Sequence, residues 1–542
     1  MFKTMLYFKI SNLNKSFINK EIFSELNLTF SEKDRVGIIG KNGEGKTTLL
    51  KMIAGMEKPD NGTISFSEKN ISIGYFDQKI NSEIFDDESI EEYVMRNTDL
   101  HDLYRNIYIK KNESTLIYDI EEFEEKRGYE ILASIDTFLI DLGLINVDSN
   151  SNVRNLSGGQ KTRLKLISIL IKKPQILLLD EPTNYLDLSA IKWLENFINN
   201  YEGIVVVISH DRSFLNNTVN QILEIDNTKY QLYLGDYDSY QEQKNKIIEK
   251  NEIKLKINNK KIVRLAESTN AKKSQANAMR LAVPDKDIDK FARGTMNKKV
   301  GQKSKDVKLM NRRIDAMINE NDNLIESKYR KMKFDIKNEE IFSDFILKIH
   351  NYDLVIGDRI LIYNINLDLF RGKRIAIQGE NGCGKTTLLK VLIASVNNEN
   401  PKIKFGNGVK IGYFSQERND MNIERTVIDW FRDGNEIFED EAANHLYNMQ
   451  FTWDQISSKI KSLSEGEKAK LALSKLILGS YNLLILDEPT SHLDILSQEA
   501  FEKTLKVFQG NIIIVSHDRY LLKNLKLDRV YEIQNKQLNS LT

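Results

Sequence analysis

Short apolar runs recur along the chain in matching surroundings. IVVVI at 204–208 and IIIV at 512–515 have the length of strands, while ILLL at 176–179 and LLIL at 483–486 each stop at an Asp-Glu pair. Continuous apolar runs of this length predict strands buried on both faces of a parallel sheet. Each of the two TTLLK segments predicts a helix that follows a strand. The pattern therefore predicts an α/β fold.

Residues 238–335 follow a helical pattern instead. Apolar residues recur at spacings of three and four along two seams, and Pro284 with the Gly294 and Gly301 pair interrupts the pattern between them. The seam residues are Ile248, Leu255, Ile262 and Leu265, followed by Val307, Met310, Ile314, Met317 and Leu324. We expect a long antiparallel helical hairpin with a basic tip at about 282–303. At ~1.5 Å per residue, about 40 residues of helix extend ~60 Å.

The rest of the chain is an internal repeat. RVGIIGKNGEGKTTLLK at 35–51 returns as RIAIQGENGCGKTTLLK at 374–390, and ILLLDEPTNYLD and VVVISHDRSFL return as LLILDEPTSHLD and IIIVSHDRYLL. The offset between copies is 338 at Gln78 but 307 at Ser157, so the first copy holds 31 additional residues. Drift in a helical layer is one explanation, and an added arm is the other. The expected organisation is a first domain at 1–237 with a helical subdomain and arm at about 80–150, a hairpin at 238–335 and a second domain at 336–542.

Composition places few limits on function. The 542 residues are 41% apolar and 29% charged with a formal net charge of zero, which gives no global attraction to nucleic acid or membrane. The single cysteine, Cys383, permits no internal disulfide. The longest apolar runs are far shorter than the ~20 residues that span a bilayer, and the first residues lack a signal-peptide core. We expect a soluble cytoplasmic protein.

Two glycine-rich loops predict phosphate binding. Both satisfy G-x-x-x-x-G-K-[ST] between an apolar run and a helix, so that backbone N–H groups and the helix dipole face phosphates. Lys46 and Lys385 are expected to reach the β- and γ-phosphates, and Thr47 and Thr386 to bind Mg²⁺. One such match could be a chance turn, but two with matching flanks are not. The expected loop residues are Gly40, Asn42, Gly43, Gly45, Lys46, Thr47 and Thr48, and Gly379, Asn381, Gly382, Gly384, Lys385, Thr386 and Thr387.

The Asp-Glu pairs supply the rest of the expected chemistry. At the carboxyl end of a parallel strand, Asp180 and Asp487 can hold the Mg²⁺ shell. Glu181 and Glu488 can then activate the attacking water as general bases. The pairs could instead cap helices, but their recurrence before P-T-x-x-L-D disfavours that role. The other residues expected to contact metal, water or γ-phosphate are Gln78, Gln416, His210 and His517, although a lone histidine after a strand is more often structural.

With these motifs, the chain resembles the ATP-binding cassette superfamily over both repeats. NLSGGQKTRL at 155–164 and SLSEGEKAKL at 462–471 are similar to its signature motif, and Asp187 and Asp494 to its D-loop aspartates. The resemblance implies a head-to-tail pair in which each ATP lies between one P-loop and the other copy's signature. One implied site combines Lys46, Gln78, Asp180, Glu181 and His210 with Ser464, Gly466 and Glu467. The other implied site combines Lys385, Gln416, Asp487, Glu488 and His517 with Ser157, Gly158, Gly159 and Gln160.

Two departures from the family pattern distinguish the copies. Glu465 stands where a second glycine is usual, and Tyr185 occupies the position that is His492 in the other copy. Glycine permits close backbone approach, so Glu465 adds a side chain beside a nucleotide interface. We expect the site closed by the 464–467 signature to turn over more slowly. The residues expected to stack on adenine are Phe17 in the first copy and Ile356 or Tyr352 in the second.

The position of the hairpin narrows the resemblance. Tandem-cassette exporters carry membrane segments, and chromosome-maintenance ATPases interrupt one cassette with a coiled coil, whereas here the hairpin joins two complete cassettes. This resembles the ABC-F family, whose cytoplasmic members bind the ribosome's tRNA exit site and extend their linker toward the peptidyl-transferase centre. The resemblance implies ATP and Mg²⁺ as cofactors and a monomer with intramolecular cassette pairing. The implied partner is the bacterial ribosome, at the exit-site region of the 50S subunit with 23S rRNA and P-site tRNA.

The centre of the chain carries the charge that RNA contact requires. Thirteen Lys or Arg and four Asp lie between Asn270 and Arg313, a net charge of +9. Because neutralised phosphates release counterions, we expect RNA binding with a steep salt dependence. A solvated hairpin kept soluble by its lysines is the alternative. The tip residues expected to contact RNA are Lys286, Lys290, Phe291, Arg293, Met296, Lys298, Lys299 and Lys303.

ABC-F members divide into general translation factors and factors that protect ribosomes from antibiotics. A long hairpin with a Lys- and Met-rich tip, and no long basic tail after the last SHDR, resembles the protecting group. We therefore expect displacement of ribosome-targeting antibiotics. A housekeeping translation factor and, more remotely, the ATPase subunit of a transporter are the alternatives.

Overall fold

The computed structural model describes most of the chain. The described residues are 6–17, 20–77, 88–96, 98–110, 115–144, 147–184, 186–226, 228–281, 290–326, 343–380, 382–397, 400–415, 421–434, 437–491 and 493–541. The chain forms two compact units. One combines Met1–Tyr240 with Met332–Thr542 and contains both repeats, and the other is Gln241–Lys331.

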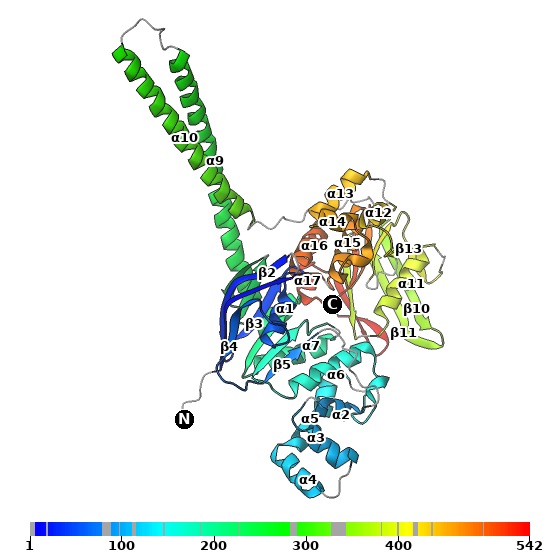
Figure 1. Ribbon diagram of the computed structural model, residues 1–542. Coiled ribbons are helices and arrows are strands. Elements are labelled where there is room, and N and C mark those ends of the chain that lie inside the picture. The colour runs from blue at the N-terminus through cyan, green and yellow to red at the C-terminus, as the bar shows by residue number, and fades with distance from the viewer. Residues whose placement is uncertain are drawn as a thin grey trace. The chain divides into compact units, whose positions relative to one another are not determined.

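A mostly parallel sheet forms the centre of the first copy (Figure 1). Among the described residues its order is β5-β6-β7-β3-β8-β9, parallel from β5 to β8, with β9 antiparallel to β8. Its strands are β3 (Arg35–Gly40), β5 (Ile73–Phe76), β6 (Ile176–Asp180), β7 (Ile204–Ile208), β8 (Gln221–Asp226) and β9 (Lys229–Leu234).

Both faces of this sheet are buried, and successive residues of the central strands alternate between them. Every residue of β6 and β7 is buried. Leu177 and Leu179 of β6 pack with the helical face, whereas Ile176 and Leu178 pack with β1, β2 and α1 on the other. A strand covered on both faces needs a continuous apolar run, which explains ILLL and IVVV in the sequence.

The second copy repeats this order strand for strand. The order β14-β15-β16-β12-β17-β18 matches that of the first copy, again with only the last strand antiparallel within the described residues. The strands are β12 (Arg374–Gly379), β14 (Ile411–Phe414), β15 (Leu483–Asp487), β16 (Asn511–Val515), β17 (Arg529–Gln534) and β18 (Gln537–Ser540). The expected fold class, α/β with two tandem domains, is confirmed.

An antiparallel layer accompanies each central sheet. In the first copy it is a separate sheet of order β2-β1-β4, and in the second the equivalent strands join the central sheet through one bridge between Tyr363 and Gln537. The strands are β1 (Tyr7–Phe17), β2 (Lys20–Ser31), β4 (Asn61–Phe66), β10 (Phe345–Ile356), β11 (Arg359–Phe370) and β13 (Ile403–Phe405).

The helices that belong to the repeated segments follow the ends of strands. Those of the first copy are α1 (Lys46–Ile53), α6 (Gly158–Leu170), α7 (Leu188–Asn199) and α8 (Arg212–Thr218). Their counterparts in the second are α11 (Lys385–Asn397), α15 (Glu465–Leu478), α16 (Ile495–Val507) and α17 (Arg519–Asn524). In the described part of the chain, no helix is both long and apolar enough to cross a membrane.

The additional residues of the first copy pack as a helical arm with its own small core. Met95, Leu100, Leu103, Tyr104 and Phe123 form a buried cluster that is separate from the main cores. The helices of this subdomain are α2 (Ile90–Arg96), α3 (His101–Tyr104), a π-helical turn (Arg105–Lys110), α4 (Leu116–Glu125) and α5 (Gly128–Asp141). The second copy has α12 (Val427–Arg432), α13 (Glu439–Asn448) and α14 (Trp453–Ser457) in the same part of its sequence. Ile131 and Leu132 pack against both this cluster and the larger core of the first copy. The interpretation of these residues as an added arm stays a prediction.

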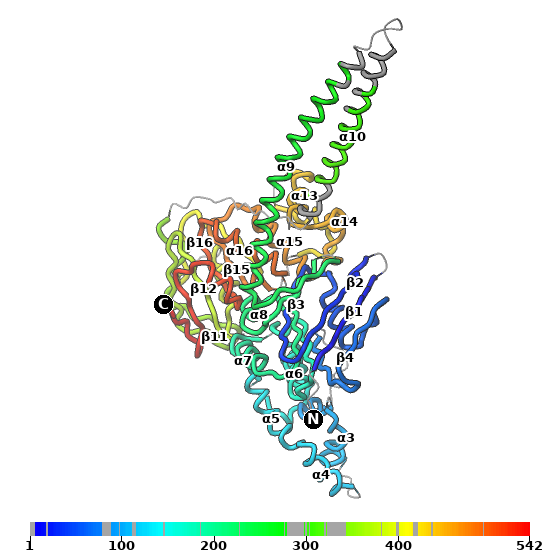
Figure 2. Tube along the Cα trace, turned by 90° about the vertical axis from the view of Figure 1, so that its left-hand side faces the viewer, coloured from blue at the N-terminus to red at the C-terminus, as the bar shows by residue number. Residues whose placement is uncertain are grey.

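Two long helices, α9 (Tyr237–Leu281) and α10 (Lys290–Glu326), lie side by side (Figures 1 and 2). Their pairing is antiparallel, because Asn258 Nδ2 donates to Asn321 Oδ1 at 3.1 Å and Lys272 lies 3.5 Å from Asp306. Leu255 is buried on the predicted seam, and the other described seam side chains are half-buried.

One expectation for the hairpin is wrong. Gly294 and Gly301 do not interrupt the pattern, since both lie inside α10, which begins at Lys290. A glycine in a helix interior destabilises the helix by only about 1 kcal/mol relative to alanine, which neighbouring helix-forming residues can offset. Pro284, the third predicted breaker, lies outside the described residues.

Candidate nucleotide site

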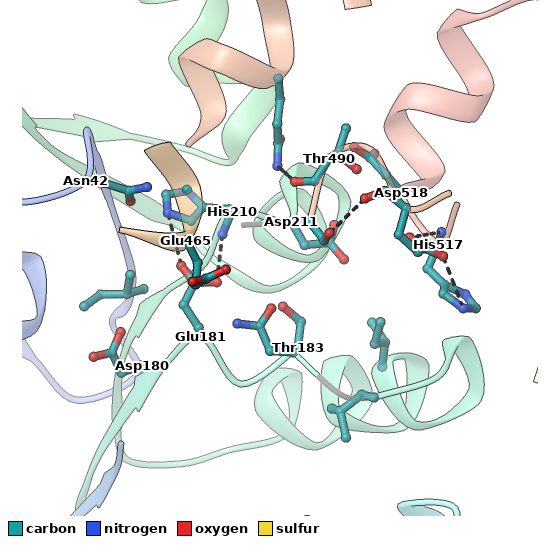
Figure 3. A pocket seen from close by; sticks show the side chains of 18 of the residues that line it. Asn42, Asp180, Glu181, Thr183, His210, Asp211, Glu465, Thr490, His517 and Asp518 are labelled. Carbon is teal, nitrogen blue, oxygen red and sulfur yellow. Dashed lines mark hydrogen bonds and ion pairs between the residues drawn. The ribbon is translucent and has the colours of Figure 1, made fainter. Parts of the chain in front are cut away.

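The predicted nucleotide residues lie at the carboxyl ends of neighbouring parallel strands. In the first copy the P-loop follows β3, Asp180 ends β6, and His210 follows β7. Because β6, β7 and β3 are neighbours, these side chains meet at one edge. They line a cavity of about 1120 Å³ that residues of the second copy also line (Figure 3).

Lys46 is the buried cation of the first P-loop. Its Nζ donates to the carbonyl oxygens of Gly40 at 2.7 Å and Lys41 at 2.8 Å. Burial lowers the pKa of Lys46, while the charges of Glu181 and Asp494 act to raise it. Gly45 has a φ of 88° and starts α1, and a Cβ there would lie 2.1 Å from Ile22 Cγ2. Only glycine permits this approach of the loop to β2.

Thr47 and Asp180 join the P-loop to the end of β6. Thr47 Oγ1 donates to Asp180 Oδ2 at 2.7 Å. Burial raises the pKa of Asp180, and the hydrogen bond from Thr47 partly opposes that rise. One hydroxyl and one carboxylate suit Mg²⁺, which usually keeps several waters and substrate phosphate oxygens as further ligands. Within the described residues, no group of three or more His, Cys, Asp or Glu side chains could hold a metal by itself.

Glu181 adopts a backbone conformation that L-residues rarely use. Its φ is +51°, and its N–H donates to Ile208 O at 2.9 Å, which fixes it across from β7. The His210 N–H donates to Glu181 Oε2 at 3.3 Å, and His210 Nε2 lies 3.4 Å from Oε1. Burial, followed by the charge of Asp180, raises the pKa of Glu181 to about 8.

The second copy reproduces this geometry. Lys385 Nζ donates to Gly379 O at 2.7 Å and Glu380 O at 2.9 Å. Glu488 has a φ of +46°, its Oε2 accepts from the His517 N–H at 3.3 Å, and burial raises its pKa to about 8. Burial and the charge of Lys385 lower the pKa of His517 to about 4, so its imidazole is neutral at pH 7.

The cavity brings together most of the predicted loop residues. Those that line it are Asn42, Gly43, Gly45, Lys46, Thr47, Thr48, Gly382, Gly384, Lys385, Thr386, Thr387, Asp180 and Asp487. Gly40 and Gly379 take part through their carbonyl oxygens. Of the two expected base contacts in the second copy, Ile356 lines the cavity, as Phe17 does, and Tyr352 does not. Gln78, Tyr185, Asn381, Gln416 and His492 lie outside the described residues.

The two signature segments begin helices in the same way. Ser157 forms a capping box with Gln160 at the start of α6, and Ser464 does so with Glu467 at the start of α15. Glu465 and Gly466 line the cavity with Glu181 and His210 (Figure 3), whereas the first signature, including Gly158 and Gly159, does not line it. Glu465 Oε1 lies 2.8 Å from Lys468 Nζ.

The D-loop aspartates act across the two copies. The charge of Asp494 acts on the pKa of Lys46, and the charge of Asp187 acts on the pKa of His517. Each aspartate caps the helix that follows it, α16 or α7, by accepting from Ser497 N or Ala190 N. Each D-loop aspartate thus acts on a nucleotide-site residue of the other copy, and the full head-to-tail pairing of P-loops with signatures stays a prediction.

Two arginines of the site were not expected from the sequence. Arg212 and Arg519 lie two residues after His210 and His517, which we call the switch histidines. Each arginine pairs with a glutamate of the other copy, Arg212 with Glu502 and Arg519 with Glu195. The available signal was the offset of 307, which relates both arginines and both glutamates.

Comparison with known families agrees with this geometry. The sequence model of the family described as ABC transporter matches residues 23–184 and 362–491, together more than half of the chain. The chain belongs to the ATP-binding cassette (ABC) family. ABC domains bind ATP, typically with Mg²⁺, and hydrolyse it, so the protein is a tandem-cassette ATPase.

The alignments with curated relatives cover nearly the whole chain, including both cassettes and the hairpin. The chain is 33% identical to YdiF of Bacillus subtilis over 98% of this chain and 81% of that protein. It is 28% identical to ABC transporter F family member 2 of Arabidopsis thaliana over 97% of this chain and 76% of that protein. Homologues of the ABC-F type are therefore among its relatives.

A solved structure shares the tandem arrangement. It is the complex of an archaeal ribosomal stalk protein and the archaeal ribosome recycling factor aABCE1, with a TM-score of 0.56. The identity is 17%, with 98% of this chain and 89% of that chain covered, so the likeness concerns the fold alone.

Proposed function

We propose that this ABC ATPase is an ABC-F factor that uses ATP to bind the ribosome at the tRNA exit site. In this proposal the α9–α10 hairpin extends toward the peptidyl-transferase centre and displaces ribosome-targeting antibiotics. The observation that carries it is a single chain in which two P-loops line one cavity and, between them in sequence, a unit of two long helices follows the first cassette. A cytoplasmic location follows from the proposed partner.

The proposed cycle starts with ATP binding. Lys46 and Lys385 exchange the loop carbonyls that they now hold for β- and γ-phosphate oxygens. Thr47 with Asp180, and Thr386 with Asp487, are the residues that would hold Mg²⁺, whose charge offsets that of the phosphates. Two ATP molecules favour the closed pair, because both copies contact the γ-phosphates only in that form.

Hydrolysis then requires a base at each site. Glu181 and Glu488 are the proposed bases, since each carboxyl is buried, points to a switch histidine and has a pKa raised to about 8. The carboxylate takes a proton from water, the water oxygen bonds to the γ-phosphorus, and the bond to the β–γ bridging oxygen breaks. His210 and His517 orient the water and γ-phosphate. Release of phosphate removes contacts between the copies and ends the ribosome-bound state.

Charge supports RNA as the target of the hairpin. A net of +9 between Asn270 and Arg313 favours the phosphate backbone, and the described side chain of Lys298 is exposed. Lys286 lies outside the described residues, and the side chains of the other proposed tip residues are not described: Lys290, Phe291, Arg293, Met296, Lys299 and Lys303. 23S rRNA and P-site tRNA are the proposed contacts.

The relatives add independent support. F family member 2 carries the ABC-F designation, and the structurally similar aABCE1 is named as a ribosome recycling factor. Two cassettes in one chain therefore occur in a protein that works on ribosomes. No membrane-spanning helix occurs in the described residues.

The first experiment tests ribosome binding. Protein with both Glu181→Gln and Glu488→Gln should bind ATP without turnover and cosediment with bacterial 70S ribosomes in ATP but not in ADP. Replacing Lys298, Lys299 and Lys303 with Gln should reduce the slope of log affinity against log salt by roughly 2 to 3. Lys256, Lys260 and Lys261, exposed on α9, provide the matched triple substitution, which should change the slope less. A double variant that stays off ribosomes at moderate salt would refute the proposal.

The second experiment separates the two ABC-F roles. The chain is expressed in a susceptible bacterium and growth is measured with lincosamides, pleuromutilins, phenicols, oxazolidinones and macrolides. Protection that is lost when residues 283–303 are replaced, with ATPase activity retained, supports the antibiotic role. Ribosome binding without any protection would instead identify a housekeeping translation factor.

A further inference from the structure

Two ion pairs join the copies away from the phosphate-binding loops. Arg212 Nη1 lies 2.8 Å from Glu502 Oε2, and Arg519 pairs with Glu195, with Arg519 Nη1 3.4 Å from Glu195 Oε2. Both arginines and both glutamates are related by the repeat offset of 307. The two pairs therefore form one reciprocal set, which we call the arginine latch.

The latch is buried. The side chains of Arg212 and Glu502 are 2% and 7% exposed, and those of Arg519 and Glu195 are 23% and 9% exposed. A buried arginine needs a carboxylate partner, because an unpaired charge in this environment is strongly unfavourable. Since each partner comes from the other copy, the pairs exist only while the copies are packed together. Formation of the latch thus reports closure.

Each half of the latch connects the two parts of one nucleotide site. Arg212 is the first residue of α8, which is capped by Asp211 directly after His210. Glu502 lies on α16, which is capped by Asp494, the aspartate whose charge acts on Lys46 of the same site. The Arg212–Glu502 pair therefore ties the switch histidine of one copy to the D-loop of the other.

The other half has the same connections. Arg519 begins α17 after His517 and Asp518, and Glu195 lies on α7, which is capped by Asp187. Asp187 acts on the pKa of His517. Both nucleotide sites are thus spanned by an ion pair that touches neither the P-loop nor the Asp-Glu motif.

The two halves differ in their neighbours, because Glu502 also pairs with Lys506 at 2.9 Å, whose repeat counterpart is Asn199, and because Arg212 has an aromatic neighbour. The guanidinium of Arg212 lies 4.3 Å from the ring centroid of Tyr520, and Arg212 Nη2 lies 3.5 Å from Asp518. The repeat counterpart of Tyr520 is Ser213, so Arg519 has no equivalent ring. A cation over a desolvated aromatic face is held more firmly than one at a wetter site.

We propose that the arginine latch positions the switch histidines, and that the Arg212–Glu502 half dominates. Closure brings each arginine onto its glutamate, which fixes the start of α8 or α17 and with it the histidine that faces the catalytic glutamate. The four residues act through His210 and His517 and do not contact substrate. The inference concerns ATP hydrolysis by the isolated protein and does not depend on ribosome binding.

The test compares Arg212→Gln in a full-length Glu488→Gln background, where only the site of Glu181 and His210 turns over, with the matched Arg519→Gln in a Glu181→Gln background, each relative to its own background as parent. Arg212→Gln should lower kcat by about tenfold or more, because small displacements of catalytic groups have large effects, and should change KM for ATP less than threefold. Arg519→Gln should lower kcat less. The milder Tyr520→Ser, which installs the residue of the first copy, should fall between parent and Arg212→Gln, and it remains informative if Arg212→Gln does not fold.

Two further variants distinguish positioning from mere stabilisation. Arg212→Gln combined with Glu502→Gln removes both buried charges, so its thermal midpoint should recover toward that of the parent while kcat stays low. The conservative Arg212→Lys, which keeps a cation beside Glu502 and Asp518, should restore part of kcat relative to Arg212→Gln. If kcat recovers together with stability in the double Gln variant, or if neither Arg212→Gln nor Tyr520→Ser lowers kcat, the latch is only a structural contact and the proposal fails.

Discussion

His210 Nε2 lies 3.4 Å from Glu181 Oε1, and the backbone N–H of the same histidine donates to the other carboxylate oxygen. The pair His517 and Glu488 repeats this arrangement, with 3.7 Å between the corresponding atoms. In both copies a glutamate with a positive φ is therefore held by a histidine that follows the neighbouring strand. Two contacts from one residue fix the direction of the carboxylate toward the cavity.

The first prediction concerns these two glutamates. Glu181→Gln and Glu488→Gln keep size and hydrogen bonding but remove the base, so the double variant should lose about 10²- to 10⁴-fold of kcat. Steady-state phosphate release measures this loss, and ATP binding should persist. The single variants should differ: Glu488→Gln should cost more, because we expect the site of Glu181, closed by the signature with Glu465, to be the slower one. Equal losses in the two single variants would contradict this asymmetry.

The second prediction concerns Glu465, whose counterpart in the first signature is Gly158. Glu465 lines the cavity, where its charge opposes that of the nucleotide phosphates. Its side chain is largely exposed and paired with Lys468, so the effect is modest. Glu465→Gly in a Glu488→Gln background, which leaves the first site active, should raise turnover roughly fivefold.

The chain itself supplies the control for that substitution. Gly158→Glu places the carboxylate in the other signature, where Lys161 stands at the position of Lys468. In a Glu181→Gln background this variant should slow turnover by a similar factor. If both exchanges leave single-site turnover unchanged, Glu465 does not cause the asymmetry.

The third prediction concerns the base of the nucleotide. Phe17 and Ile356 occupy equivalent positions and both line the cavity, with about half of each side chain exposed. An aromatic ring stacks on a base more favourably than an aliphatic side chain, with a free energy of about 1–3 kcal/mol relative to alanine. Phe17→Ile should therefore weaken ATP binding by up to about tenfold, and Ile356→Phe should strengthen it. Calorimetry on the Glu181→Gln, Glu488→Gln protein measures both affinities.

Inorganic triphosphate distinguishes a base contact from a general loss of the site. It lacks adenine, so its affinity should not change in Phe17→Ile. An equal weakening of ATP and triphosphate would mean that Phe17 supports the P-loop and does not stack on the base.

Much of this site was predictable because its chemistry is local in sequence. Gly45, Lys46 and Thr47 are consecutive, and the strand before them and helix after them already fix their directions. The choice of Ile356 over Tyr352 was also available in the sequence, because the offset that relates Lys46 to Lys385 makes Ile356 the counterpart of Phe17. The positive φ of Glu181 was not predictable, because its N–H bonds to Ile208 on another strand.

The hairpin was also predictable only in part. Its apolar seam was readable from spacing, but Asn258 and Asn321, both buried in that seam, are polar and so were invisible to an apolar pattern. Buried asparagines in a helical seam favour one register over others at a cost in stability. The glycines of α10 were misread because propensity is a weak guide where two long helices pack together.

The protonation state of Asp211, the residue after His210, also depends on contacts that are distant in sequence. Asp211 caps α8 by accepting from Phe214 N at 2.9 Å, and burial, with the charge of Asp518 acting in the same direction, raises its pKa to about 6. The folded pKa thus exceeds the ordinary value of about 3.9. The unfolded chain releases this proton first, so the group costs stability as pH rises from about 4 to 6. The cost is fully present above pH 6 and absent below pH 4.

The fourth prediction follows from this loss of stability with rising pH. Asp211→Asn keeps an acceptor for Phe214 N but removes the buried charge, so it should stabilise the protein at pH 7.5 by about 1–3 kcal/mol. The gain should shrink at pH 4.5, where the folded parent already holds the proton. Denaturant unfolding of parent and variant at the two pH values measures the difference, followed through a signal from the first cassette. The prediction is wrong if the gain is the same at both pH values or if the variant is less stable at pH 7.5. Either result would mean that neighbouring arginines stabilise the Asp211 carboxylate in the folded chain more than burial destabilises it.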